Sequence, residues 1–163
     1  KLTALITDLL TQQQLTGDNL IIEITEGLLM HSEEYTHEQL LELRNLGVEV
    51  ALDDFGTGYS SISYLKQFDI DYIKIDQSFI RSLPSSSQDA VLCEAMTAMA
   101  HKLDIKVITE GVETNLQTDI LEAMDCDYGQ GFYYYHPQTA EQITHIFLSQ
   151  RNSIKIEDTF NLC

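Results

Sequence analysis

Five short runs rich in β-branched and aromatic residues alternate with longer stretches in which apolar residues recur at helical spacing. The runs expected as strands are Leu20–Thr25, Val48–Leu52, Tyr72–Ile75, Lys106–Ile108 and Phe132–Tyr135, the last preceded by Tyr128–Gly131. The stretches expected as helices are Leu2–Leu10, Glu33–Leu46, Ala90–Leu103, Thr114–Met124 and Ala140–Leu148. This alternation predicts an α/β fold with a parallel sheet and right-handed crossovers.

The number of these units predicts an incomplete barrel. Five βα units occupy nearly all of the 163 residues, whereas a closed TIM-type (β/α)8 barrel needs about 250 residues. We therefore expect a barrel truncated to about five βα units, with about three N-terminal strands missing. The chain begins at Lys1 without Met or a signal segment, so we expect either that a leader has been removed or that this is a piece of a longer protein. Residues 1–149 are assigned to the partial domain and residues 150–163 to a C-terminal tail.

Charge and composition exclude several classes of function. The chain has 9 Lys and Arg against 26 Asp and Glu, a formal net charge of −17, so nucleic acids and anionic lipids would be repelled. A phosphate ester remains acceptable if a divalent metal neutralises clustered carboxylates. No apolar run is long enough to span a membrane. Three cysteines without zinc-site spacing are expected to be reduced thiols in a cytoplasmic protein.

Polar residues follow each of the expected strands at or near its carboxyl end. In parallel α/β folds, the loops at this end of the sheet converge on one crevice, and function collects there. The residues are Glu23 and Glu26, Asp53 and Asp54, Lys74 and Asp76, Glu110 and Glu113, and Gln130. Five successive strands that deliver polar side chains to the same edge predict a functional site.

The chemistry of two of these positions stays open on the residues alone. Asp53 and Asp54 are adjacent, and burying two like charges is costly unless a cation such as Mg²⁺ or Mn²⁺ compensates. Their side chains should point to opposite faces until the strand ends and a turn follows; a solvated turn is the alternative. Lys74 lies in an apolar run, where it could steady a water or phosphoryl oxygen, form an imine, or pair with Asp76 or another carboxylate.

Five motifs, in this order and spacing, make the chain resemble the EAL domain of bacterial cyclic di-GMP phosphodiesterases. They are LIIEITE, ALDDFGTGYSS, YIKIDQSF, ITEGVE and YGQGFYYYHP. The resemblance extends from about Leu2 to Leu148. It implies a modified TIM barrel, two Mg²⁺ or Mn²⁺ ions, and hydrolysis of cyclic di-GMP to linear pGpG.

The resemblance also implies a role for each polar strand-end residue. The implied metal ligands are Glu23, Asp53, Asp54 and Glu110, with Asp53 bridging both ions. Lys74 resembles the catalytic lysine that holds the attacking water, and Glu110 is assigned to catalysis as well. Gln130 is similar to a substrate-binding residue, Glu26 to the glutamate that anchors the DDFGTGYSS loop, and Asp76 and Glu113 to supporting residues.

Two features of the family are absent from the sequence. The Glu-Ala-Leu triplet, whose Glu ligates metal, does not occur, nor does the strand that carries a metal-binding Asn. Glu94-Ala95-Met96 is no substitute, because it lies in an expected helix. Both missing ligands belong to the N-terminal part that we expect to be absent. The parent domain is therefore expected to be active and these 163 residues alone inactive.

Two other functions remain as alternatives. The parent could bind cyclic di-GMP and signal without cleaving it, or Lys74 could form a Schiff base as in aldolase-type barrels. For partners, we expect cyclic di-GMP, a second copy or another chain that completes the barrel, and sensory or cyclase domains fused upstream. A membrane anchor, if the parent has one, would lie in those upstream regions.

Overall fold

The computed structural model describes residues 2–31, 33–58, 65 and 67–151. Its strands are β1 (Ile21–Thr25), β2 (Glu49–Phe55), β3 (Tyr72–Ile75), β4 (Lys106–Glu110) and β5 (Tyr128–Gln130). Its α-helices are α1 (Leu2–Gln13), α2 (Glu26–His31), α3 (Glu33–Asn45), α5 (Gln77–Ser82), α6 (Ser87–His101), α7 (Asn115–Ala123) and α8 (Ala140–Arg151). A single 3-10 turn, η1 (Gly17–Asn19), precedes β1.

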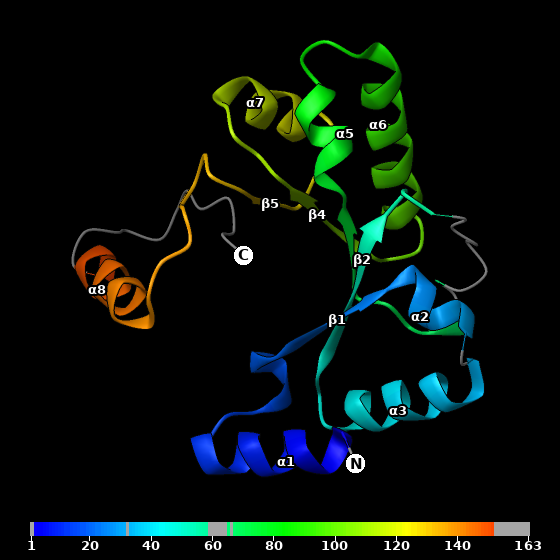
Figure 1. Cartoon of the computed structure of the whole chain (residues 1–163), viewed down its shortest axis with the longest axis vertical. Helices are drawn as coiled ribbons and strands as arrows, with labels where there is room; N and C mark the ends of the chain where they lie inside the picture. The colour runs from blue at the N-terminus through cyan, green and yellow to red at the C-terminus, as the bar shows by residue number, and fades with distance from the viewer. Residues whose placement is uncertain (1, 32, 59–64, 66, 152–163) are drawn as a thin grey trace.

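The strands form one parallel sheet in the order β1-β2-β3-β4-β5, so each strand pairs with its neighbour in the sequence (Figure 1). The predicted parallel α/β sheet is confirmed, and β3 has the predicted bounds. Because sequential strands lie side by side, their carboxyl ends share one edge of the sheet. β1 and β5 are the outer strands among the described residues.

Alternation along the strands gives the sheet two different faces. Val50, Ile73, Ile75 and Val107 are buried in the main apolar core, which also contains residues of α3, α5, α6 and α7. The residues between them point to the opposite face. There, the amino half of the sheet carries a smaller apolar cluster around Tyr72, and the carboxyl half carries the charged residues.

The predicted strand at Phe132–Tyr135 is wrong. β5 ends at Gln130, and the next residues form a turn in which the backbone N–H groups of Tyr134 and Tyr135 donate to the Gly131 carbonyl. Phe132, Tyr133 and Tyr135 are exposed, so only Tyr134 of this aromatic run packs against the core. The turn requires glycine at position 131, because a Cβ there would collide with the Val112 backbone.

Two helices were not predicted, and the bounds of the predicted helices differ from the structure by a few residues. The short helices α2 and α5 were not predicted, because six residues are too few to show helical periodicity. α8 continues to Arg151, past the predicted end at Leu148. Residues 152–163 lie outside the described part of the chain, so the C-terminal tail stays a prediction. Among the described residues, no helix is long and apolar enough to cross a lipid bilayer.

The two described cysteines are buried free thiols, as their spacing suggested. Cys93 lies in α6 and Cys126 follows α7. Burial raises the pKa of the Cys93 thiol to about 12 and that of Cys126 to about 11, which keeps both in the unreactive thiol form. Cys163 lies outside the described residues.

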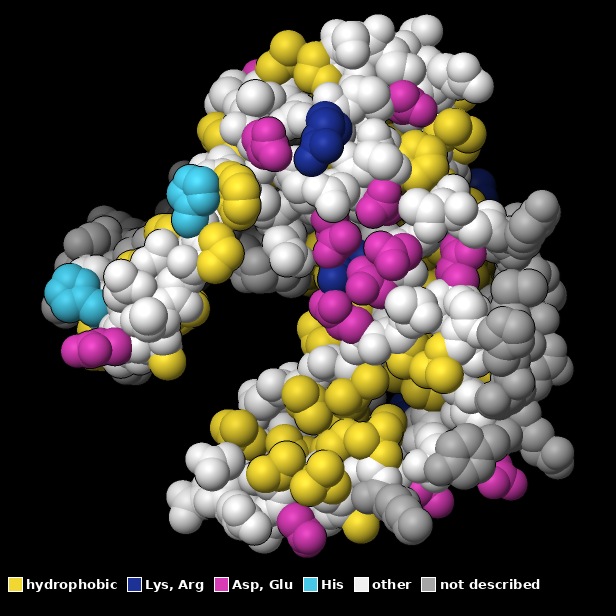
Figure 2. Space-filling model, in the orientation of Figure 1, with side chains coloured by type: hydrophobic (Ala, Val, Ile, Leu, Met, Phe, Trp, Pro, Cys, Tyr) yellow, Lys and Arg dark blue, Asp and Glu magenta, His cyan; other side chains and the backbone are white. Residues whose placement is uncertain are grey.

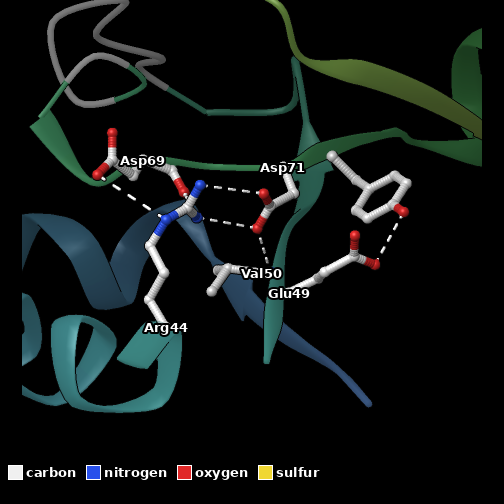
Figure 3. A network of polar contacts seen from close by, with 6 residues as sticks. Arg44, Glu49, Val50, Asp69 and Asp71 are labelled. Atoms are coloured by element: carbon white, nitrogen blue, oxygen red, sulfur yellow. Dashed lines mark hydrogen bonds and ion pairs between the residues drawn. The ribbon is translucent and has the colours of Figure 1, made fainter. Parts of the chain in front are cut away.

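A polar network fixes the segment between β2 and β3 to the end of α3 (Figure 3). The Asp71 carboxylate accepts hydrogen bonds from both terminal nitrogens of Arg44, at 3.1 and 3.2 Å, and from the Val50 backbone N–H at 2.8 Å. Asp69 lies 3.9 Å from Arg44 Nε but is mostly exposed. Asp71 therefore joins α3, β2 and the start of β3.

In the parent domain with its full set of strands, replacing Asp71 with Ala should lower the free energy of unfolding by about 1–3 kcal/mol, because Arg44 and the Val50 N–H lose their acceptor. Urea unfolding followed by circular dichroism measures the change. Asp69→Asn is the matched control, since exposed ion pairs contribute little, and should shift the free energy by less than about 0.5 kcal/mol. Equal losses in the two variants would contradict the role of Asp71.

Candidate metal and catalytic site

Lys74 forms the centre of the charged face. It lies in β3 and is 4% exposed. Its Nζ atom is 2.7 Å from Glu110 Oε1, 2.9 Å from Glu23 Oε2 and 3.1 Å from Asp53 Oδ1. A buried ammonium is tolerated only when opposite charges compensate it, and three carboxylates do so here. Lys74 is thus neutralised by carboxylates of other strands, and no ion pair with Asp76 is found.

Strand register explains why these four side chains meet. Glu23 belongs to β1, Asp53 to β2 and Glu110 to β4, so the acidic residues approach Lys74 from both sides of β3. Side chains two residues apart share a face of a strand, and the parallel pairing keeps the carboxyl ends together. Figure 2 shows acidic side chains gathered around a basic one at the edge of a hollow in the surface.

An irregularity inside β2 brings Asp54 to the same place. β2 extends to Phe55, beyond the predicted end at Leu52, and its pairing with β3 shifts between Leu52 and Phe55. Asp54 has a φ of 56°, a left-handed conformation that Asp adopts more easily than most residues. The sequence predicts that the strand ends at Leu52 and that a turn after it could bring both carboxylates to one site. In the structure, the strand continues, and the register shift within it brings the Asp54 carboxylate close to that of Asp53.

Asp53, Asp54 and Glu110 each offer a carboxylate oxygen, and these oxygens lie within 4.8 Å of one another. Hard oxygen ligands at this spacing fit Mg²⁺, Mn²⁺ or Ca²⁺, whose remaining positions water or substrate oxygens can fill. The donor set lacks the sulfur and imidazole ligands that select zinc or copper. Glu23 is not in this group, but its ion pair with Lys74 places it beside the group. The residues present therefore fit a hard divalent cation.

The ionisation of Lys74 follows from its partners. Burial lowers the pKa of a lysine, but hydrogen bonds from Lys74 to Glu110, Glu23 and Asp53 outweigh this effect and raise its pKa well above the ordinary value. Lys74 is therefore a fixed positive charge at neutral pH. A charged amine can donate hydrogen bonds to an anionic oxygen, but it is not a nucleophile.

Glu26 contacts the loop that follows β2. The Gly56 N–H donates to Glu26 Oε1 at 3.4 Å, and a Cβ placed on Gly58 would lie 2.7 Å from Glu26 Oε2. Glycine at position 58 thus allows the loop to pass close to the carboxylate. The contacts are those expected of a loop anchor. The rest of the DDFGTGYSS motif, residues 59–61, lies outside the described residues.

The other three predicted residues differ in their distance from the cluster. Gln130 ends β5 and pairs in register with Glu110, so it lies at the same edge of the sheet. Asp76 caps α5 by accepting a hydrogen bond from the Ser78 N–H at 2.9 Å, and hydrogen bonding from Ser78, chiefly from its side chain, lowers the Asp76 pKa. Glu113 is exposed beyond the end of β4. Asp76 and Glu113 are outside the cluster formed around Lys74.

One buried residue that contacts the segments following β3 and β4, Gln117, is not among the sequence predictions. It is 4% exposed, and its side chain bonds to backbone groups of two separate segments. The pattern Thr114-x-x-Gln117 is a capping-box signature that could have identified it.

Comparison with known proteins is decisive for the family. The family model described as "EAL domain" matches residues 2–137. The chain belongs to the EAL domain family. One relative of this EAL chain, the cyclic di-GMP phosphodiesterase NbdA of Pseudomonas aeruginosa, is 43% identical over 128 residues, or 78% of this chain and 16% of that protein.

Solved structures agree with the family assignment. The PaMucR phosphodiesterase, in complex with c-di-GMP, matches 85% of this chain and 56% of its own with a TM-score of 0.80 and 38% identity. The Klebsiella pneumoniae protein BlrP1, in a manganese and cyclic di-GMP complex, matches 80% of this chain and 33% of its own with a TM-score of 0.75 and 32% identity. The described sheet is thus part of a TIM-like barrel, as predicted. The chain spans 16% to 26% of the length of the curated relatives it matches.

In the metal-free parent domain with its full set of strands, Lys74→Met should lower stability by roughly 3 kcal/mol, because three carboxylates lose their shared cation. The raised pKa of Lys74 makes this contribution complete below its ordinary pKa of 10.5 and lost as the pH rises through the folded-state value. The difference in unfolding free energy between wild type and variant should therefore shrink as the pH rises above 10.5.

Urea unfolding from about pH 8 to pH 12 measures this difference. Lys102→Met, at an exposed lysine of the segment after α6, is the control and should show no such trend. A difference between wild type and Lys74→Met that stayed constant over the whole range would rule out the proposed charge compensation.

Proposed function

We propose that the domain to which this chain contributes hydrolyses cyclic di-GMP to linear pGpG with the help of two divalent cations, Mg²⁺ or Mn²⁺. The observation that carries the proposal is the meeting of Glu23, Asp53 and Glu110 around Lys74, with Asp54 alongside. The names of related proteins, a phosphodiesterase among them and a manganese and cyclic di-GMP complex, support the choice of substrate and metal class.

Each carboxylate has a role in the proposal. Asp53, Asp54 and Glu110 hold the cations, and Glu23 joins them from β1. When bound, such cations lower the pKa of a coordinated water and neutralise charge on the phosphodiester oxygens. The neighbouring strands of the sheet hold these four carboxylates close together.

The remaining residues position substrate and water. Lys74 donates hydrogen bonds from a fixed positive charge to an attacking water or a phosphoryl oxygen. Gln130, in register with Glu110, contacts the substrate from β5. Glu26 holds the loop after β2 in place through Gly56. Asp76 and Glu113 support the loops by capping α5 and beginning the turn into α7.

The Schiff-base alternative conflicts with the charge of Lys74. Imine formation needs a neutral amine, whereas the three carboxylates keep the Lys74 amine protonated. Borohydride in the presence of a carbonyl substrate should therefore leave Lys74 unmodified. The receptor alternative retains binding of cyclic di-GMP but no turnover, so the assay below distinguishes it directly.

In the parent domain with its full set of strands, Asp53→Asn should lower the rate of pGpG formation at least about 100-fold, because a carboxylate that would hold a cation is lost. Lys74→Ala should have an effect of the same order. Chromatography of the reaction with Mn²⁺ measures pGpG, and Asp8→Asn on α1 controls for loss of one negative charge. Undiminished turnover in either site variant contradicts the assigned roles, and binding without turnover in wild type supports the receptor function.

We also propose that strands outside these 163 residues complete the barrel, in the same polypeptide or in a second chain. The five strands of the described residues are fewer than the eight of a closed barrel. The outer strand β1 leaves Ile21 exposed, and α1, which packs against α3, exposes Leu2, Leu5 and Leu9. A cytoplasmic location is part of this proposal, and the two buried free thiols support it. Sensory or cyclase domains upstream of this chain are a separate part of the proposal.

The 163-residue chain alone should therefore self-associate, because an unpaired apolar strand edge binds other chains. Light scattering coupled to size-exclusion chromatography measures the mass of the particles. Ile21→Lys, which places a charge on the edge strand, should shift the distribution towards monomer, whereas Leu116→Lys on α7 should not. A wild-type chain that is monomeric and unfolds cooperatively would overturn the proposed incompleteness.

A further inference from the structure

Gln117 is a buried polar residue whose side chain uses all its hydrogen-bonding groups. Its Oε1 atom accepts hydrogen bonds from the backbone N–H groups of Glu113 at 2.8 Å and Thr114 at 2.9 Å, and from Thr114 Oγ1 at 3.1 Å. Its Nε2 atom donates to the Ile80 carbonyl at 2.9 Å. One side chain thereby joins the segment after β4 to α5.

These two segments lead directly to the charged cluster. The segment 111–114 continues β4 from Glu110, and α5 begins three residues after Lys74. The backbones also approach closely: Gly111 has a φ of +73°, and a Cβ there would lie 2.6 Å from the Gln77 Cβ. The spacing between the carboxyl ends of β3 and β4 therefore depends on contacts at Gly111 and Gln117.

The contact of Lys74 with Glu110 depends on the same spacing. At 2.7 Å it is the shortest of the three ion pairs of Lys74, and Glu110 belongs to the group of carboxylates that fits a metal. A small separation of the two strand ends would lengthen this contact and open the cluster. Gln117 forms its hydrogen bonds with other residues than Lys74 and Glu110, so any effect of Gln117 on the Lys74–Glu110 distance acts through the backbone.

We propose that Gln117 is a positioning residue that holds the ends of β3 and β4 at the spacing required for the Lys74–Glu110 contact and for the metal-binding carboxylates. The part that concerns metal rests on the proposed function; the part that concerns the ion pair does not. The tie from Nε2 to Ile80 is the functional element, and the capping bonds of Oε1 are its local support.

Two variants separate the tie from the cap. Gln117→Leu removes all the hydrogen bonds of the side chain. Gln117→Glu keeps an acceptor for the Glu113 and Thr114 N–H groups, at a helix N-terminus where negative charge is favourable, but sets an oxygen against the Ile80 carbonyl. Thr118→Val is the matched control, because Thr118 is buried in the same helix and its hydroxyl bonds to the Thr114 carbonyl and to Tyr134 rather than to α5.

The experiment measures two properties of the parent domain with its full set of strands. Titration calorimetry gives the dissociation constant for Mn²⁺, and nuclear magnetic resonance of the metal-free domain detects the ammonium group of Lys74, whose protons exchange slowly when they are buried and hydrogen-bonded. Both Gln117 variants should bind Mn²⁺ at least about tenfold more weakly and lose the ammonium signal. Thr118→Val should retain the signal and stay within about twofold of wild type.

The outcomes distinguish the two proposals. If Gln117→Glu keeps wild-type Mn²⁺ affinity and the ammonium signal, Gln117 only caps α7, and the positioning role is wrong. If wild type binds no Mn²⁺, the metal-dependent function fails, while the ammonium signal in the variants still decides the positioning role. Loss of signal in Thr118→Val as well would show a general effect of α7 packing and would also overturn the proposal.

Discussion

The ion pairs of Lys74 are the interaction on which the described site depends. One buried ammonium lies within 3.1 Å of carboxylates from three other strands. With Asp54, the cluster has four carboxylates against one ammonium, which leaves a formal charge of 4 − 1 = 3 negative units. Concentrated negative charge of this size is a binding site for hard divalent cations, and their binding would relieve the remaining repulsion.

The sheet makes such a concentration of charge tolerable. The helix-facing side chains of β2, β3 and β4 are fully buried and hold the strands in register, so the carboxylates on the other face cannot move apart freely. Turns and caps at the carboxyl edge add to this restraint: Asp76 caps α5, Gly111 lets the loop after β4 approach α5, and Gln117 ties them together. The buried apolar side chains lie on one face of the parallel sheet, and the mutually repelling carboxylates lie on the other.

Sequence patterns predicted the sheet and the strand-end residues, because buried parallel strands read as short apolar runs and polar residues stand out beside them. Tyr72–Ile75 is correct at both ends for this reason. Phe132–Tyr135 is wrong because aromatic β-propensity does not register the turn at Gly131. Asp53 and Asp54 converge because of a register shift in β2, which no residue type in the sequence indicates. The ion-pair partners of Lys74 come from neighbouring strands rather than from Asp76, which is near it in the sequence.

Membership of the EAL domain family and the arrangement of the carboxylates lead to one central claim, that side chains of separate strands share divalent cations at the edge of the sheet. Anomalous X-ray diffraction from crystals soaked in MnCl₂ measures this directly. The account predicts a manganese peak about 2 Å from oxygens of Asp53, Asp54 and Glu110. A map with no peak among these three residues, or with manganese bound only elsewhere on the chain, would contradict it.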